Sequence, residues 1–303
     1  LGPLLFLIYI NDLASVSTSL KSIIFADDTN IFTSGRNILE LENKMNIELK
    51  LLVEWLNANK LSLNIQKTHF MVFRPRKKKC PDPINIKINN IDIDEVISTK
   101  FLGVTIDNQL TWKQHIAITA KKISKCVGIL SKAKKVLSLQ PLLMLYNAFI
   151  LPYLTYCIIV WGGTINTTLL PLQKLQNRAI KCITNMPKRS SASELYKKYR
   201  FLSINNLFRY VVLIFMYKFN HMLLPDIFSD YFTLNSQIHR YNTRQRSHIH
   251  LPIYKTNLGK ESVKYTGALL FNEFHDAILS CKSLWYFKRS IKTPLCYNLY
   301  LLS

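Results

Sequence analysis

Two adjacent carboxylates, Asp27 and Asp28, are the residues of this 303-residue chain best suited to chemistry. Short apolar runs at residues 23–26 and 31–33 flank them, and Asp favours turns, so the pattern predicts a tight β-hairpin. Carboxylate oxygens on a hairpin suit Mg²⁺, which proteins bind through one or two carboxylates together with substrate phosphates. Two such ions can clamp the attacking and leaving oxygens of a phosphoryl transfer. A bare Asp-Asp pair is more often an ordinary polar loop. The rest of the chain must therefore distinguish a metal-binding hairpin from such a loop.

The distribution of charge indicates a polyanionic partner. The formal net charge is +22; residues 1–108 carry 13 basic and 12 acidic residues, whereas residues 109–303 carry 27 and 6. No acidic residue occurs from Asn108 to Ser193. A half-chain this basic is expected to bind nucleic acid. A merely soluble basic surface, or contact with anionic lipid, is the alternative.

The remaining composition narrows the class of protein. Hydrophobic residues make up 49% and aromatic residues 12% of the chain, which excludes general disorder. The six cysteines are far apart and lack zinc-ligand spacing, and there is no secretory signal, so an intracellular protein of nucleus or cytoplasm with reduced thiols is expected. The apolar run 148–161 is too short for a membrane span. The first residue is not Met, and we expect the chain to be part of a longer protein.

The first third of the chain is expected to combine helices with short strands, as in an α+β fold. A helix within residues 1–13, apolar on all sides, is expected to lie buried under a sheet, and residues 37–59 carry the clearest helical periodicity. Residues 61–64 and 68–73 resemble strands, with Lys67 in the turn between them. Residues 84–93 predict a strand pair turning at Asn89 and Asn90. Residues 100–107 predict a further strand or hairpin, in which Gly103 indicates a bulge or close backbone approach.

The rest of the chain is predicted to be mainly helical. Apolar periodicity predicts helices over 115–137, 138–151, 169–184, 193–199, 205–222, 266–279 and 285–291, with basic loops at 241–250 and 255–264. Lysines 121, 122, 125, 132, 134 and 135 fall on other faces of the first of these helices than its apolar residues. Lys174, Arg178 and Lys181 follow at steps of four and three, so they can share a face. Histidines 115, 221 and 275 are expected on helix faces rather than as metal ligands.

Several stretches, taken together and in order, resemble the reverse transcriptases of non-LTR, LINE-type or jockey-like retrotransposons. Phe25-Ala-Asp-Asp28 resembles their catalytic Tyr/Phe-Ala-Asp-Asp box, and residues 1–13 resemble the end of the motif that contacts template and substrate. Leu61-Ser-Leu-Asn64 with Lys67-Thr68 is similar to the next palm motif, and Phe101-Leu-Gly-Val104 is similar to the primer grip. Residues 175–179, 241–244, 256–267 and 287–289 resemble the C-terminal extension of the same elements.

The resemblance implies RNA-directed DNA synthesis, in which deoxynucleoside triphosphates are added to a DNA primer on an RNA template with Mg²⁺ or Mn²⁺. Asp27 is implied as a metal ligand, Asp28 as its less direct neighbour, and Phe25 as a buried support of the hairpin below the primer end. Asn64 and Lys67 are implied to position the substrate, with Lys67 placed to neutralise or protonate the leaving pyrophosphate. From the residues alone, Lys67 is equally well explained as an ordinary surface lysine. The primer terminus would be held by Phe101, Leu102 and Gly103.

Basic residues of the loop after residue 73 and of the later helices are expected to contact the nucleic-acid backbone in a salt-dependent, sequence-tolerant way. These are Arg74, Arg76, Lys77, Lys78, Lys121, Lys122, Lys125, Lys174, Arg178 and Lys181. For the loop, a solvated surface or an address signal is the alternative.

The resemblance divides the chain into a partial palm at 1–108, a helical thumb at 109–200 and a basic C-terminal extension at 201–303. The family's first palm aspartate and its fingers would precede Leu1, so the metal site is expected to be one ligand short. Three functions therefore stay open: a polymerase segment, a catalytically inactive nucleic-acid-binding remnant of one, and a structural helical protein with a chance Asp-Asp. The sequence leaves the oligomeric state undetermined.

Overall fold

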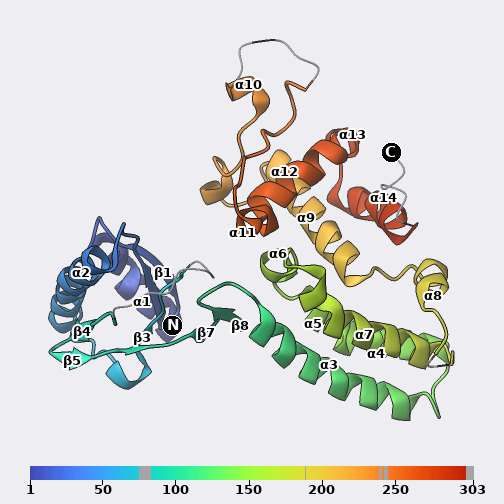
Figure 1. Cartoon of the computed structure of the whole chain (residues 1–303), viewed down its shortest axis with the longest axis horizontal. Coiled ribbons are helices and arrows are strands. Elements are labelled where there is room, and N and C mark those ends of the chain that lie inside the picture. The colour runs from blue at the N-terminus through green and yellow to red at the C-terminus, as the bar shows by residue number, and fades with distance from the viewer. Residues whose placement is uncertain (75–82, 188, 239–240, 242–244, 298–303) are drawn as a thin grey trace. The chain divides into compact units, whose positions relative to one another are not determined.

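The computed structural model of the chain describes residues 1–74, 83–187, 189–238, 241 and 245–297 (Figure 1). It contains two compact units. The N-terminal unit comprises residues 1–101 and 107–110, and the C-terminal unit comprises residues 102–106 and those from 111 onward. The chain is mainly helical with small two-stranded sheets, which is consistent with the predicted α+β class. The predicted boundary near residue 200 lies within the C-terminal unit and stays a prediction.

The N-terminal unit combines two α-helices with short strands. Its elements are α1 (Gly2–Ile10), η1 (Asn11–Ser15), β1 (Lys21–Phe25), β2 (Asp28–Phe32), α2 (Ile38–Ala58), η2 (Ile65–Lys67), β3 (His69–Phe70), β4 (Lys87–Ile88), β5 (Ile91–Asp92), β6 (Asp94–Glu95) and β7 (Ser98–Phe101). The pairs β1–β2 and β4–β5 are antiparallel, and β3–β6 is parallel. β7 pairs with β8 (Val104–Asp107).

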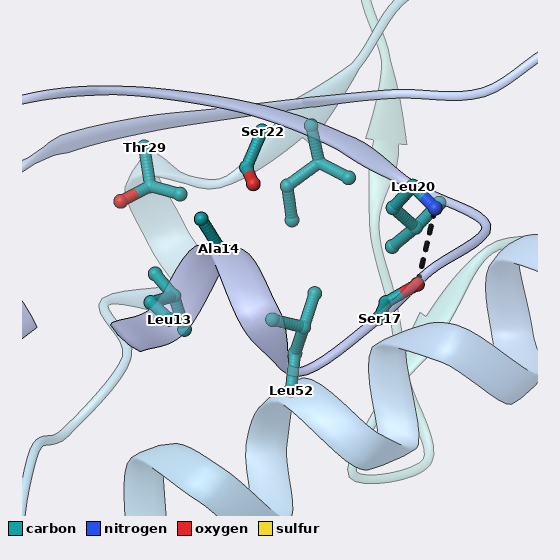
Figure 2. Close-up of a pocket in the computed structure, with 8 residues that line it drawn as sticks. Leu13, Ala14, Ser17, Leu20, Ser22, Thr29 and Leu52 are labelled. Carbon is teal, nitrogen blue, oxygen red and sulfur yellow. Dashed lines mark hydrogen bonds between the residues drawn. The ribbon is translucent and has the colours of Figure 1, made fainter. Parts of the chain in front are cut away.

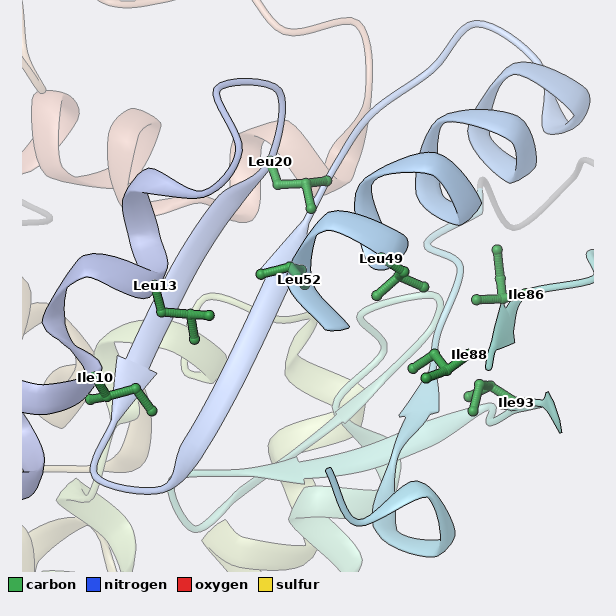
Figure 3. Close-up of a cluster of buried hydrophobic side chains, with 8 residues drawn as sticks. All are labelled: Ile10, Leu13, Leu20, Leu49, Leu52, Ile86, Ile88 and Ile93. Atoms are coloured by element: carbon green, nitrogen blue, oxygen red, sulfur yellow. The ribbon is translucent and has the colours of Figure 1, made fainter. Parts of the chain in front are cut away.

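The predicted helix at 37–59 is confirmed as α2, and its start follows from one side chain. Asn37 has an extended backbone, and its side chain accepts a hydrogen bond from the Glu40 backbone N–H at 2.8 Å, an N-cap. Leu49 and Leu52 on α2 are buried and join a cluster that links the first and last thirds of the unit (Figure 3). The other buried members are Ile10, Leu13, Leu20, Ile86, Ile88 and Ile93.

The first helix forms as predicted, but its predicted burial is wrong. Of the α1 residues only Ile10 is buried, whereas Leu4, Leu5, Leu7 and Ile8 are at least half exposed. A helix that is apolar on all sides needs a covering surface on all sides. Among the described residues, only Phe6 and Ile10 of α1 pack against the core cluster.

Two of the predicted strands are also corrected. Residues 61–64 form no strand, because the Asn64 side chain accepts a hydrogen bond from the Lys67 N–H and so closes the turn η2. The strand expected over 68–73 shortens to β3. The strand pair at 84–93 is confirmed, with Asn89 (φ 51°) and Asn90 (φ 63°) as its two-residue turn. Asn tolerates this left-handed conformation better than most residues.

The C-terminal unit is built from helices. They are α3 (Lys113–Ala133), α4 (Leu139–Phe149), α5 (Leu151–Thr155), α6 (Ile158–Trp161), α7 (Asn166–Ile183), α8 (Ser193–Lys198), α9 (Ile204–Asn220), α10 (Asn235–Ile238), α11 (Asn257–Glu261), α12 (Val263–Glu273), α13 (His275–Ser280) and α14 (Leu284–Tyr297), with η3 (Asp226–Phe228) after α9. The helical predictions are therefore confirmed in kind, with shifted ends. The expected loop at 255–264 instead contains α11, which begins where Thr256 accepts a hydrogen bond from the Gly259 N–H.

Two helix packings organise this unit. α3 lies along α7, and α9 packs against α12 and α14 (Figure 1). The fully buried amide of Gln176 on α7 donates to the Tyr146 hydroxyl at 2.9 Å and to the Leu202 carbonyl at 2.8 Å. These bonds tie α7 to α4 and to the segment before α9. Within the part of the chain that the structure describes, no helix is both long and apolar enough to cross a bilayer.

Candidate active site and nucleic-acid interface

The predicted hairpin forms, with its tip one residue earlier than expected. Phe25 pairs with Asp28, so Ala26 and Asp27 make the turn and Asp28 is the first residue of β2. Ala26 has a φ of 52°, in the left-handed region that favours glycine. This turn places the two carboxylates differently: Asp27 lies at the tip, and Asp28 starts a strand.

Strand alternation sets which groups share a face with Asp28. Cross-strand partners lie on the same side of a sheet, so Asp28 shares its side with Phe25. Both carboxylates are exposed, and Phe25 is 58% exposed rather than buried as expected. The opposite side of the hairpin faces inward, with Ile24 and Ile31 packed against the core cluster.

The inner side of the hairpin is closely packed. Figure 2 shows Ser22 and Thr29 of the hairpin facing Leu13, Ala14 and Leu52 across a small cavity. Its volume is about 10 Å³, which is room for one water molecule at most. Within the described residues the core therefore supports the carboxylate turn, and this cavity is too small to hold a substrate.

The carboxylates meet part of what a magnesium site needs. Exposed carboxylate oxygens are the donors that Mg²⁺ and Mn²⁺ prefer, and Mg²⁺ takes its remaining ligands from substrate phosphates and water. Among the residues that the structure describes, no three His, Cys, Asp or Glu side chains gather to hold a metal ion. Asp27 and Asp28 thus fit a metal site whose other ligands come from substrate phosphates and water, and not a site built from protein side chains alone.

Asn64 and Lys67 lie together in one local turn. The Asn64 side-chain oxygen accepts from the Lys67 backbone N–H at 3.2 Å, and its carbonyl accepts from the Thr68 hydroxyl at 2.9 Å. The Lys67 side chain is exposed. Asn64 therefore fixes the backbone that carries Lys67, a role that the residue types alone did not indicate.

The basic loop is only partly described. One guanidinium nitrogen of Arg74 donates to both carboxylate oxygens of Glu95, at 2.8 and 3.1 Å. The guanidinium therefore already has an anionic partner. The predicted contacts Arg76, Lys77 and Lys78 lie outside the described residues.

Leu102 and Gly103, two of the predicted primer-grip residues, form the turn between β7 and β8, and Phe101 ends β7. Both turn residues have positive φ, 44° and 84°. The Tyr156 hydroxyl donates to the Leu102 carbonyl at 2.6 Å, and a Cβ on Gly103 would lie 3.3 Å from the Tyr156 ring. The close backbone approach predicted at Gly103 is therefore confirmed, and Tyr156 is the partner.

Two further side chains hold this region, and sequence reasoning missed their roles. The Trp161 indole donates to the Tyr156 carbonyl at 2.9 Å. His115 on α3 is buried, its ring lies 5.5 Å from that of Trp161, and its Nδ1 accepts from the Thr105 N–H at 3.3 Å. Burial, and secondarily the charge of Lys122, lower the pKa of His115, which favours the neutral ring that this bond requires. His115 and Trp161 lie more than 40 positions apart, so no local sequence signal links them.

The predicted basic contacts of the helices lie mostly on the outside. On α3 the residues His115, Ile116, Ile123, Val127 and Leu130 face inward, and the exposed residues include Lys121, Lys122 and Lys125. Lys122 also lies over the Tyr153 ring at 5.6 Å. On α7, Lys174 and Arg178 are exposed and Lys181 is half-buried. The two neighbouring helices therefore present cations, and the sequence supplies no acidic residue in either.

Comparison with known proteins finds a family match in the N-terminal part of the chain. Residues 1–106 match the family described as reverse transcriptase (RNA-dependent DNA polymerase). The chain is 28% identical over 192 residues to a probable RNA-directed DNA polymerase from transposon X-element of Drosophila melanogaster, covering 61% of this chain and 21% of that protein. It is 27% identical over 198 residues to the RNA-directed DNA polymerase from mobile element jockey of Drosophila funebris, covering 62% and 21%.

The aligned region thus spans about a fifth of the length of these curated relatives. No solved structure matches the chain. The carboxylate hairpin, the Asn64–Lys67 turn and the Leu102–Gly103 turn all lie within the matched residues 1–106. This segment is therefore similar to reverse transcriptases, and the relatives that match the chain include polymerases of jockey and X-element mobile elements.

Proposed function

We propose that the chain is a segment of an RNA-directed DNA polymerase of a jockey-like, non-LTR mobile element. The observation that carries this proposal is the exposed Asp27–Asp28 pair on a supported hairpin inside the region that matches the family. An RNA template, a DNA primer and deoxynucleoside triphosphates are the proposed partners. The exposed cations of α3 and α7 support it, because a polymerase must hold a polyanionic duplex.

In the proposed reaction Asp27 and Asp28 would hold Mg²⁺ or Mn²⁺. When bound, such an ion would supply Lewis acidity toward the primer hydroxyl and the transferring phosphoryl group. Lys67 offers its exposed ammonium to the leaving pyrophosphate, and Asn64 acts through Lys67 by fixing the turn beneath it. The Leu102–Gly103 turn, held by Tyr156, orients the primer end.

We further propose that a third carboxylate must come from outside the described residues. Two carboxylates are present on the hairpin, and no described cluster offers three metal ligands. The relatives are about five times as long as the aligned region, so they contain sequence that can supply it. A catalytically inactive nucleic-acid-binding remnant is the second candidate function, favoured by the same shortage of ligands.

Binding and catalysis can be tested separately. A fluorescent RNA–DNA primer–template is titrated with the chain at several salt concentrations, and extension is measured on the same substrate with Mg²⁺. We expect binding whose affinity falls steeply with salt, with log K changing by nearly one per tenfold salt for each phosphate contacted. Replacing Lys121 and Lys125 with Gln should reduce that slope by up to about two. An unchanged slope would remove α3 from the interface.

The control is Lys255→Gln, which makes the same change to an exposed lysine outside α3 and α7. It should leave both affinity and slope near those of the parent chain. Binding without extension in any context would favour the inactive remnant. No affinity for primer–template at low salt would contradict both candidate functions.

A further inference from the structure

The surface of α14 carries exposed aromatic and basic side chains together, and the polymerase proposal does not use them. Trp285 is 68% exposed and Tyr286 is 60% exposed. Lys288, Arg289 and Lys292 on the same helix are also exposed. Isolated exposed apolar residues are ordinary, but a tryptophan and a tyrosine beside three cations need a reason.

Helical spacing places these groups on one side of α14. Lys288, Arg289 and Lys292 follow Trp285 by three, four and seven positions, which brings all four onto one stripe. Arg289 lies over the Trp285 ring at 5.6 Å and is also three positions from Tyr286. At a rise of about 1.5 Å per residue, the stripe from Trp285 to Lys292 is roughly 10 Å long.

The helix beneath this stripe is firmly held. Phe287, Ile291 and Leu295 are almost fully buried, and the Phe287 ring stacks on Tyr217 of α9 at 4.6 Å. The Asn206 amide of α9 donates to the Leu295 carbonyl at 2.7 Å. The aromatic–basic side is therefore the outer side of a fixed helix.

The charged side chains of α14 itself are all basic. The sequence has no acidic residue after Asp276. α14 packs against α8, and Arg200, just after α8, lies near enough to the buried Cys296 to affect its thiol. Burial raises the pKa of that thiol, and the positive charges of Lys292 and Arg200 oppose the rise.

We propose that α14 is a binding site for single-stranded nucleic acid, separate from the duplex-binding helices α3 and α7. Exposed aromatic rings stack on unpaired bases, and neighbouring lysines and arginines neutralise the backbone phosphates. Duplex bases are already stacked on one another, so the exposed rings favour a single strand. This inference goes beyond the polymerase function and does not depend on it.

An anionic membrane is the other partner that aromatic and basic residues fit. An interfacial helix must insert its apolar face into the lipid. The apolar face of α14 is occupied by α9, as the burial of Phe287 and Ile291 shows. Nucleic acid therefore fits this surface better, and vesicles become one arm of the test.

Intrinsic fluorescence can report on this site alone. Of the four tryptophans, Trp112 and Trp161 are buried, Trp55 is half-buried and Trp285 is exposed. Oligo(U) and oligo(dT) twelve-mers are titrated into the full chain at moderate salt. We expect stacking to quench Trp285, and the quenching to be absent in Trp285→Phe, which removes the indole and keeps a ring able to stack.

Affinity is measured in parallel by anisotropy of labelled oligo(U). Trp285→Leu should weaken binding about tenfold, because stacking of one base typically contributes more than 1 kcal/mol. Trp285→Phe should stay within about twofold. The Lys288→Gln/Arg289→Gln variant should reduce the salt slope by about 1.4, at about 0.7 per phosphate for a single strand. Lys255→Gln is the matched charge control and should change nothing.

Several results would overturn the proposal. These are no quenching by either oligonucleotide, equal quenching by a blunt duplex, or a Trp285→Leu variant that folds by circular dichroism and binds oligo(U) as the parent does. Quenching or a blue shift with phosphatidylserine vesicles, and none with oligonucleotides, would assign the surface to a membrane instead. None of these readouts depends on primer extension, so the polymerase proposal and the α14 proposal can fail independently of one another.

Discussion

Replacing Gly103 with Ala tests the contact on which the Leu102–Gly103 turn depends. Gly103 has a φ of 84°, and an added Cβ would lie 3.3 Å from Tyr156 Cε1 and 3.4 Å from its hydroxyl oxygen. The left-handed backbone alone costs a residue with a side chain about 1–2 kcal/mol. The tight approach to the ring adds to that cost, so we expect the free energy of unfolding to fall by about 1–3 kcal/mol.

The contact and the backbone terms can be separated by a double-mutant cycle. In a Tyr156→Ala background the ring is absent, so Gly103→Ala should cost only the backbone term. Urea unfolding followed by tryptophan fluorescence suits the experiment, because Trp161 is buried and bonded to the Tyr156 carbonyl. Equal costs in the two backgrounds would refute the assigned contact.

Gly128 is the matched control within the same unit. It lies inside α3, and a Cβ there would meet nothing within 4 Å. Alanine is a better helix former than glycine, so Gly128→Ala should stabilise the chain by about 0.5–1 kcal/mol. The same substitution thus has opposite signs at the two positions. A destabilising Gly128→Ala, or a neutral Gly103→Ala, would contradict the local geometry described for that residue.

Two further predictions concern the C-terminal unit. His115 has a lowered pKa in the folded state, so the unfolded chain binds its proton more readily, and stability should fall as the pH drops below about 6.5. His115→Gln should reduce this loss between pH 7.5 and 5.5 in urea titrations, and an unchanged pH dependence would refute the role of the neutral ring. Gln176→Leu should cost about 2–4 kcal/mol, because it leaves the buried Tyr146 hydroxyl and the Leu202 carbonyl without their donor. A cost below about 1 kcal/mol in thermal or urea unfolding would mean that the network relaxes or admits water.

Local patterns predicted the structure where one side chain or one periodicity decides it. The apolar spacing and the Asn37 cap define α2. Asn89 and Asn90 define the turn of the β4–β5 hairpin. The carboxylate hairpin followed from the flanking apolar runs, with its tip displaced because Asp28 pairs with Phe25. In each case the residues that determine the element lie within a few positions of it.

Prediction from the sequence failed where contacts between distant parts of the chain determine the structure. The burial of α1 depends on which surfaces cover it, and its own composition contains no information about them. The bond between Tyr156 and Leu102 joins residues 54 positions apart, so no local pattern reveals it. The predicted strand at residues 61–64 is absent for a local reason. The Asn64 side chain accepts the Lys67 N–H, and such side-chain bonds offer the backbone an alternative to strand pairing.

Asp27 and Asp28 are proposed to serve nucleotidyl transfer, and the cations of α3 and α7 are proposed to serve nucleic-acid binding. The most direct measurement is primer extension on an RNA template with Mg²⁺, using this chain and the chain extended upstream into the polymerase region of its relatives. We expect extension with the longer chain. Asp27→Asn should abolish that activity while primer–template affinity stays within about twofold, because Asp27 lies on the hairpin and not on the basic helices. Full activity in the Asp27→Asn variant, or parallel loss of binding and extension in a folded variant, would contradict the proposed catalytic role of Asp27.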